Sequence, residues 1–178
     1  FYCFSDESYL IVKSDLKLEM SGHRIILDEG NGWNFTALRD TIFYLQYSHN
    51  CTEVNARNRY DGVARFFRAY FYFEKVKRYG DIPWYDKALD SDDPELYKAR
   101  DSGEFVMQKM LEDLDFAIAN LPKTKNAYVL TRWTALALKS RVCLFEATFR
   151  KYHGLEDYEK YLNACVSASE TFMNESGY

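Results

Sequence analysis

The residues that could act in catalysis are few and scattered along this sequence. The three histidines, His23, His49 and His153, lie far apart, and none belongs to an HExxH metal-binding motif. The sequence also contains no GxSxG nucleophile motif and no P-loop. We therefore name no catalytic residue and expect a protein that is not an enzyme.

Clusters of carboxylates are present, but their spacing does not favour a metal or an acid-base pair. Glu112 and Asp113 are adjacent on an amphipathic stretch, where solvated charge is the usual outcome. The acidic runs 90–93 and 28–31 begin like calcium loops, yet they lack the glycine at the sixth position and the glutamate at the twelfth. We expect solvated turns, with no metal and no cofactor.

A basic stretch from Arg57 to Arg78 is interleaved with aromatic residues, a pattern similar to a platform for single-stranded nucleic acid. The whole chain is acidic, however, with 23 Lys and Arg against 27 Asp and Glu and a net charge of −4. Arg65 and Arg68 lie on a segment that looks buried, where arginine usually pairs with carboxylates. We expect structural ion pairs here and no nucleic-acid partner.

The composition indicates the elements that must position these residues. The chain has 13 Phe, 15 Tyr and 3 Trp but only 8 Gly and 3 Pro, which argues against sandwiches, barrels and disordered chains. Apolar residues recur at helical spacing between the few glycines and prolines. The third helical segment opens with a capping-box spacing, Asp101 followed by Glu104. The predicted fold is all-α, with helices at about 34–54, 61–79, 101–121, 131–152 and 155–178.

Two of these segments look like repeats of each other. A shift of 73 residues places Ala64 on Ala137 and Arg68 on Arg141. The two helices then become the second helices of two antiparallel hairpins, each near the roughly 34-residue size of a tetratricopeptide unit. Segment 61–79 is apolar nearly all round, so we expect it to be covered on more than one side.

The predicted organisation is a single helical domain, an α-solenoid of tetratricopeptide-like hairpins with long loops. Within its irregular N-terminal arm, residues 9–12 and 16–20 could form short strands. The predicted parts are the arm at 1–33, hairpin one at 34–79, a long loop at 80–103, hairpin two at 104–152, and the first helix of a third unit at 155–178.

Three aromatic residues fall outside the helical patterns. Trp33 lies between a glycine and the expected cap Asn34, while Trp84 and Tyr85 follow the turn at 80–83. Packing is the alternative role for each of them, and Trp133, just inside a helix, is expected in the core. The four cysteines have no zinc-ligand spacing, so we expect small buried hydrophobic residues.

The order of several sequence blocks resembles a known family. Residues 64–73 lead into Arg-Tyr-Gly-Asp-Ile-Pro at 78–83, and similar blocks follow at 113–122 and 135–142. Together they resemble the SusD/RagB family of outer-membrane nutrient-binding lipoproteins.

The resemblance implies tetratricopeptide-like hairpins, an N-terminal lipidated cysteine and a SusC-like TonB-dependent transporter as partner. It implies capture of glycans or other nutrients at the cell surface, without catalysis. Trp33, Trp84 and Tyr85 then become the candidate glycan-binding residues. Family members are much longer, so we expect the N-terminal part of a longer protein, with its lipid anchor outside this segment and with Cys3 not lipidated.

Two other functions remain open. The repeat pattern alone is also typical of a generic tetratricopeptide scaffold that mediates protein–protein interaction. The aromatic residues and carboxylates alone would also fit a helical glycosidase.

Overall fold

The structure is a computed structural model that describes residues 21–22, 32–125 and 127–177 of the chain. The chain forms two compact units, Phe1–Phe35 and Thr36–Tyr178. In the first unit the Trp33 and Phe35 rings meet edge to face, with centroids 5.2 Å apart. The strands considered at 9–12 and 16–20, and Cys3, lie outside the described residues.

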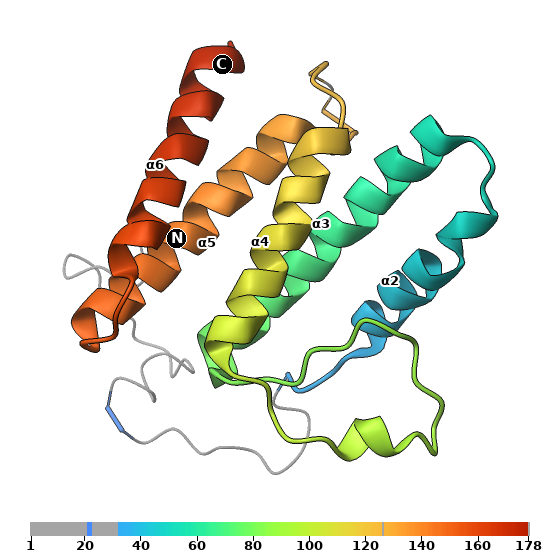
Figure 1. The fold of residues 1–178 in the computed structure, drawn as a ribbon, viewed down its shortest axis with the longest axis horizontal. Helices are drawn as coiled ribbons and strands as arrows, with labels where there is room; N and C mark the ends of the chain where they lie inside the picture. Colours follow the sequence, from blue (N-terminus) through green and yellow to red (C-terminus); the bar gives the residue numbers. More distant parts are fainter. Residues whose placement is uncertain (1–20, 23–31, 126, 178) are drawn as a thin grey trace. The chain divides into compact units, whose positions relative to one another are not determined.

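The second unit is built from helices, as predicted. Figure 1 shows its α-helices side by side, and each packs against the next along the chain. Within the described residues there is no strand, and the nearest approach to one is a bridge between Ile82 and Asp101. The helices are α2 (Thr36–Tyr47), η1 (Ser48–Asn50), α3 (Val54–Tyr79), η2 (Pro94–Tyr97), α4 (Gly103–Asn120), α5 (Arg132–Tyr152) and α6 (Tyr158–Glu175).

The core of this unit lies where α3 faces α4. Tyr72 and Phe73 of α3 are fully buried, as are Met107, Met110 and Leu114 of α4. The three α4 residues recur at steps of three and four, so they form one continuous apolar stripe along the helix. This stripe fixes α4 against α3 and leaves the other face of α4 to charged residues.

Several helix bounds differ from the sequence prediction: the predicted helix 34–54 ends as α2 at Tyr47, α6 begins at Tyr158 instead of 155, and two further starts differ for local reasons. α3 begins at Val54, seven residues before the predicted 61, because residues 54–60 are mostly polar, none of them is buried, and they give no clear apolar signal. The predicted capping box at Asp101 is wrong: Ser102 is the N-cap, and its Oγ accepts a hydrogen bond from the Phe105 N–H at 3.3 Å. The carboxylate of Asp101 is engaged elsewhere, as described below.

α3 packs against both α2 and α4, so it is covered on two sides, as expected for its apolar sequence. Three aromatic residues of α3 nevertheless remain about half exposed, Tyr60 at 57%, Phe67 at 50% and Tyr70 at 47%. The described helices therefore bury only part of the aromatic surface of α3.

The equivalence of α3 and α5 holds in the structure, but at an offset of 74 residues instead of 73. At 74, seven of the eight buried residues of α3 fall on buried residues of α5, whereas at 73 only three do. The same offset places Gly80 on Gly154, and both glycines have positive φ at the end of their helix. The predicted register is therefore wrong by one residue, because matching side-chain types aligned Arg68 with the exposed Arg141.

These two glycines provide a stability prediction. Gly80→Ala or Gly154→Ala is expected to lower the free energy of unfolding by about 1–2 kcal/mol, because the left-handed backbone strains any Cβ. At both positions an added Cβ would meet nothing within 4 Å, so the backbone is the sole source of the cost. Denaturant unfolding measures the loss, and Gly103→Ala is the control because Gly103 has no positive φ. Equal unfolding midpoints for all three variants would contradict the prediction.

Candidate functional site

The segment that carries Trp84 and Tyr85 is tied down at both ends. The backbone groups of Ile82 and Asp101 exchange two hydrogen bonds of 3.2 Å. The Asp101 carboxylate accepts the Trp84 N–H at 2.7 Å and pairs with the Lys98 ammonium at 2.8 Å. Burial alone would raise the pKa of the Asp101 carboxyl, but these two partners outweigh it and hold the pKa below its usual value. Asp101 therefore closes the loop instead of capping α4.

Trp84 lies inside the protein, in the packing role that the sequence analysis gave as its alternative to glycan contact. Its side chain is 5% exposed and stacks on the Tyr72 ring, with centroids 4.3 Å apart and planes 25° apart. The Arg68 guanidinium lies 5.0 Å from the Trp84 ring centroid. The loop folds back over α3, and the indole becomes part of the packing there.

Tyr85 is half-buried beside this stack. Its backbone N–H donates to the Tyr72 hydroxyl at 2.7 Å, and the Lys98 ammonium lies 5.1 Å from its ring centroid. The Tyr72 hydroxyl donates in turn to the Pro83 carbonyl at 3.4 Å. Burial raises the pKa of Tyr72 well above its usual range, so this hydroxyl keeps its proton and its role as a donor.

Trp33 is the most exposed of the three candidate residues, at 44%. It belongs to the unit Phe1–Phe35, whereas Trp84 and Tyr85 belong to Thr36–Tyr178. Trp84 and Tyr85 therefore lie together in the second unit, whereas Trp33 belongs to the first unit. Trp133 is in the core as predicted, 5% exposed, and its indole N–H donates to the Lys123 carbonyl at 2.7 Å.

Buried charge in this unit is structural, as expected for the basic stretch, whereas the expectation of solvated charge is wrong for Asp113, whose side chain is 3% exposed. The Arg68 guanidinium donates two hydrogen bonds of 2.7 Å to the Asp113 carboxylate, one to each oxygen. The Arg65 guanidinium lies 3.8 Å from the same carboxylate and 4.1 Å from the Phe116 ring centroid. These contacts join α3 to α4.

The described residues contain no group of His, Cys, Asp and Glu that could hold a metal ion. In the acidic run 90–93, the Asp93 carboxylate accepts the Glu95 N–H at 2.9 Å and caps η2. The run 28–31 lies outside the described residues. Among the part of the chain that is described, no helix is both long enough and apolar enough to cross a membrane.

The cysteines differ in burial. Cys143 is fully buried, as predicted, and burial raises the pKa of its thiol to about 11. Cys51 is exposed, so the prediction of a buried residue is wrong there, and Cys165 is intermediate. All three are free thiols.

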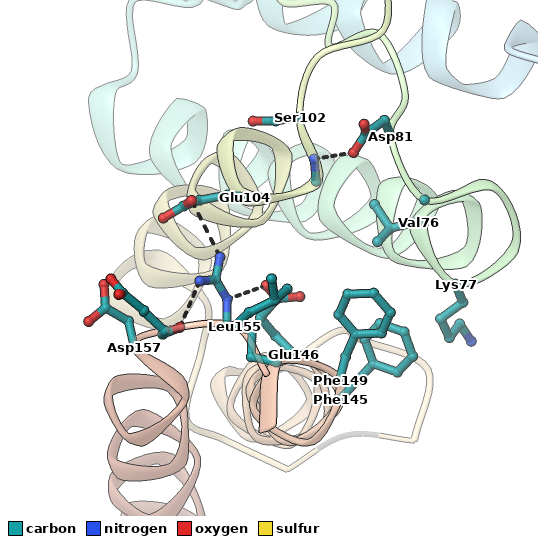
Figure 2. Close-up of a pocket in the computed structure, with 14 residues that line it drawn as sticks. Val76, Lys77, Asp81, Ser102, Glu104, Phe145, Glu146, Phe149, Leu155 and Asp157 are labelled. Atoms are coloured by element: carbon teal, nitrogen blue, oxygen red, sulfur yellow. Dashed lines mark hydrogen bonds and ion pairs between the residues drawn. The ribbon is translucent and has the colours of Figure 1, made fainter. Parts of the chain in front are cut away.

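A cavity of about 750 Å³ lies at one end of the helices, and the sequence did not predict it. Figure 2 shows side chains from several segments around it, including Phe145, Phe149, Glu104 and Asp157. The walls come from the ends of α3 and α5, the start of α4 and the link to α6. In the sequence, acidic residues follow both helix-ending glycines, as Gly-Asp at 80–81 and Gly-Leu-Glu-Asp at 154–157, but neither stretch alone indicates a cavity.

One buried arginine organises this cavity. The Arg150 guanidinium donates to a Glu146 carboxylate oxygen at 2.7 Å and to the Glu156 carbonyl at 3.0 Å, and it lies 3.6 Å from the Glu104 carboxylate. Burial alone would lower the pKa of Arg150, but the Glu146 hydrogen bond and the nearby carboxylates hold it above its ordinary value. Arg150 is therefore a fixed cation that links α5 to the chain leading into α6.

Comparison with known proteins identifies the family. Residues 29–132, more than half of the chain, match the SusD-like family described as starch-binding and associating with the outer membrane. Over 87 residues the chain is 29% identical to the SusD-like protein P38 of Formosa agariphila. This matched region is 49% of this chain and 17% of that protein.

Solved structures have the same fold. A SusD-like protein of Bacteroides fragilis superposes with a TM-score of 0.65 at 28% identity, covering 79% of this chain and 25% of that one. A structure solved with a xylogluco-oligosaccharide gives a TM-score of 0.67 at 20% identity, covering 80% and 28%. The chain thus spans 17% to 28% of the length of these relatives. With its helical fold and its matched residues, the chain belongs to the SusD-like family.

Proposed function

We propose that this chain is part of a non-catalytic cell-surface protein that binds a glycan or another nutrient. The bound nutrient passes to a SusC-like TonB-dependent transporter in the outer membrane, and a lipid anchor outside this segment holds the protein there. The observation that carries the proposal is the family match over residues 29–132, a family described as starch-binding and associating with the outer membrane. The fold shared with a structure solved with a xylogluco-oligosaccharide supports it.

We propose Trp33 and Tyr85 as two separate candidates for glycan contact, one in each unit of the chain. Glycans are held by aromatic rings with an accessible face, together with polar groups nearby. Trp33 is 44% exposed, and Tyr85 is half-buried beside the Lys98 ammonium. Trp84, whose ring lies against Tyr72 and Arg68, has a supporting role, because it fixes the segment that carries Tyr85.

Trp33→Ala is expected to weaken glycan binding by roughly thirtyfold, because truncating an aromatic residue at the centre of a binding site costs about 2 kcal/mol. The measurement is affinity electrophoresis of the chain in gels that contain starch, xyloglucan or other polysaccharides, one per gel. Tyr128→Ala is the matched control, because Tyr128 is an aromatic residue of 98% exposure that we do not place in the site.

Unchanged retardation of Trp33→Ala would remove Trp33 from the site. If no polysaccharide retards the unsubstituted chain or the full-length protein, glycan binding is contradicted. Failure of the full-length protein to co-purify with a transporter from outer membranes would contradict the delivery step.

A further inference from the structure

We propose that the cavity formed by the ends of α3 and α5 binds a basic segment of a partner protein, through a Lys or Arg side chain on an apolar stretch. This interaction goes beyond glycan binding and does not depend on it. The cavity of about 750 Å³ falls within the usual size of ligand pockets, about 300–1,000 Å³.

The cavity carries a surplus of negative charge. Its lining contains five carboxylates, but its cations are only Lys77 and Arg150. Both cations are already engaged: the Lys77 ammonium lies 2.6 Å from the Glu74 carboxylate, and Arg150 is held by Glu146. Two helix C-termini and two helix N-termini meet at this end, so their dipoles largely cancel. The charged side chains therefore determine the electrostatic potential in the cavity, which is negative.

The surplus carboxylates lie on the accessible side of the cavity. The Glu104 side chain is 65% exposed, and its single ion-pair contact is the 3.6 Å approach to Arg150. Glu156 and Asp157 are exposed, and their carboxylates make no hydrogen bond or ion pair with the described residues. Figure 2 shows Glu104 and Asp157 on the same side of the cavity, across from the phenylalanine rings. An incoming cation would thus meet carboxylates from two segments.

The opposite wall is apolar, and its aromatic rings pack against neighbouring rings. The Phe149 ring lies 4.1 Å from the His153 ring and nearly parallel to Phe145, at 6.2 Å and 14°. Phe145 meets Phe73 edge to face at 5.6 Å. Phe149 is still 43% exposed, so this wall keeps apolar surface open to a ligand. A Lys or Arg side chain fits such a cavity, because it places an aliphatic stem on apolar surface and a cation among carboxylates.

The test uses the 178-residue chain and a capped hexapeptide of alternating lysine and leucine. Isothermal titration is expected to show binding that weakens with added salt, because the carboxylates are exposed. The double variant Glu104→Gln/Asp157→Asn is expected to weaken binding about tenfold. Both sites are exposed, and asparagine tolerates the positive φ of 62° at Asp157, so the variant keeps its fold.

Two controls separate this site from general attraction to an acidic protein. Glu112→Gln removes an exposed carboxylate that pairs with Lys109 on α4 outside the cavity, and it is expected to leave peptide affinity unchanged. The same hexapeptide with glutamine in place of lysine is expected not to bind. Equal loss in Glu112→Gln, or equal binding of the glutamine peptide, would overturn the proposal. A glucosamine oligomer that binds through Glu104 and Asp157 while the lysine peptide does not would overturn it in favour of a cationic glycan.

Discussion

Asp113→Ala is expected to lower the free energy of unfolding by about 3–5 kcal/mol, because it leaves the Arg68 guanidinium buried without its counter-charge. The two side chains are 10% and 3% exposed and share two hydrogen bonds of 2.7 Å. Denaturant unfolding followed by circular dichroism gives the value. The loss of one carboxylate thus removes a large part of the stability of a domain of this size.

Asp115→Ala is the matched control, two residues further along α4. The Asp115 carboxylate is 58% exposed and pairs with Lys139, and such surface pairs contribute about 0–1 kcal/mol. The double variant Arg68→Leu/Asp113→Leu is expected to lose less than Asp113→Ala, because no unpaired charge remains. Equal losses for Asp113→Ala and Asp115→Ala would show that the Arg68 pair is not buried as described.

Trp84→Ala is expected to cost about 3–5 kcal/mol of unfolding free energy, the usual range for removing a buried aromatic side chain. The indole fills the space between the Tyr72 ring and the Arg68 guanidinium, so its loss leaves a cavity and exposes an ion pair to water. Thermal and denaturant unfolding both measure the effect. Tyr85→Ala is the control from the neighbouring position, and its loss should be smaller because Tyr85 is half-buried.

A glycan-binding measurement distinguishes the packing role of Trp84 from direct contact between Trp84 and the glycan. Trp84→Phe keeps a buried ring at this position and is expected to bind glycan like the unsubstituted chain. The structure would be contradicted at this residue if Trp84→Ala retained full stability but lost retardation in polysaccharide gels, since that result requires an exposed indole.

The sequence allowed the fold class and the helices to be predicted because their signals are local. The spacing of Leu38 and Ile42, or of Met110, Leu114 and Ala117, reports one buried face within a few turns. The start of α3 was missed because none of residues 54–60 is buried, and a mostly polar stretch forms helix without an apolar pattern. The offset of 74 was missed because burial, and not side-chain identity, is what the two helices share.

The candidate site was less predictable because it depends on distant partners. Trp84 looks like a loop aromatic in sequence, and only its contacts with Tyr72, twelve residues earlier, and Asp101, seventeen residues later, place it inside. The cavity at the helix ends is assembled from four segments of the chain, so no single stretch shows it. Whether a side chain is exposed, and which segments form a cavity, depend on the tertiary structure. The periodicity of a helix depends only on the local sequence.

The segment between α3 and α4 is held together at its two ends, and this affects how far the length of the segment can change. Because Ile82 and Asp101 are bridged and Lys98 donates to the Trp84 carbonyl at 2.6 Å, the stretch 86–97 is a closed loop whose ends are already fixed. Doubling the length of such a loop costs only about 0.6 kcal/mol of closure entropy. We therefore expect insertions in this stretch to cost little stability and to leave Trp84 in place.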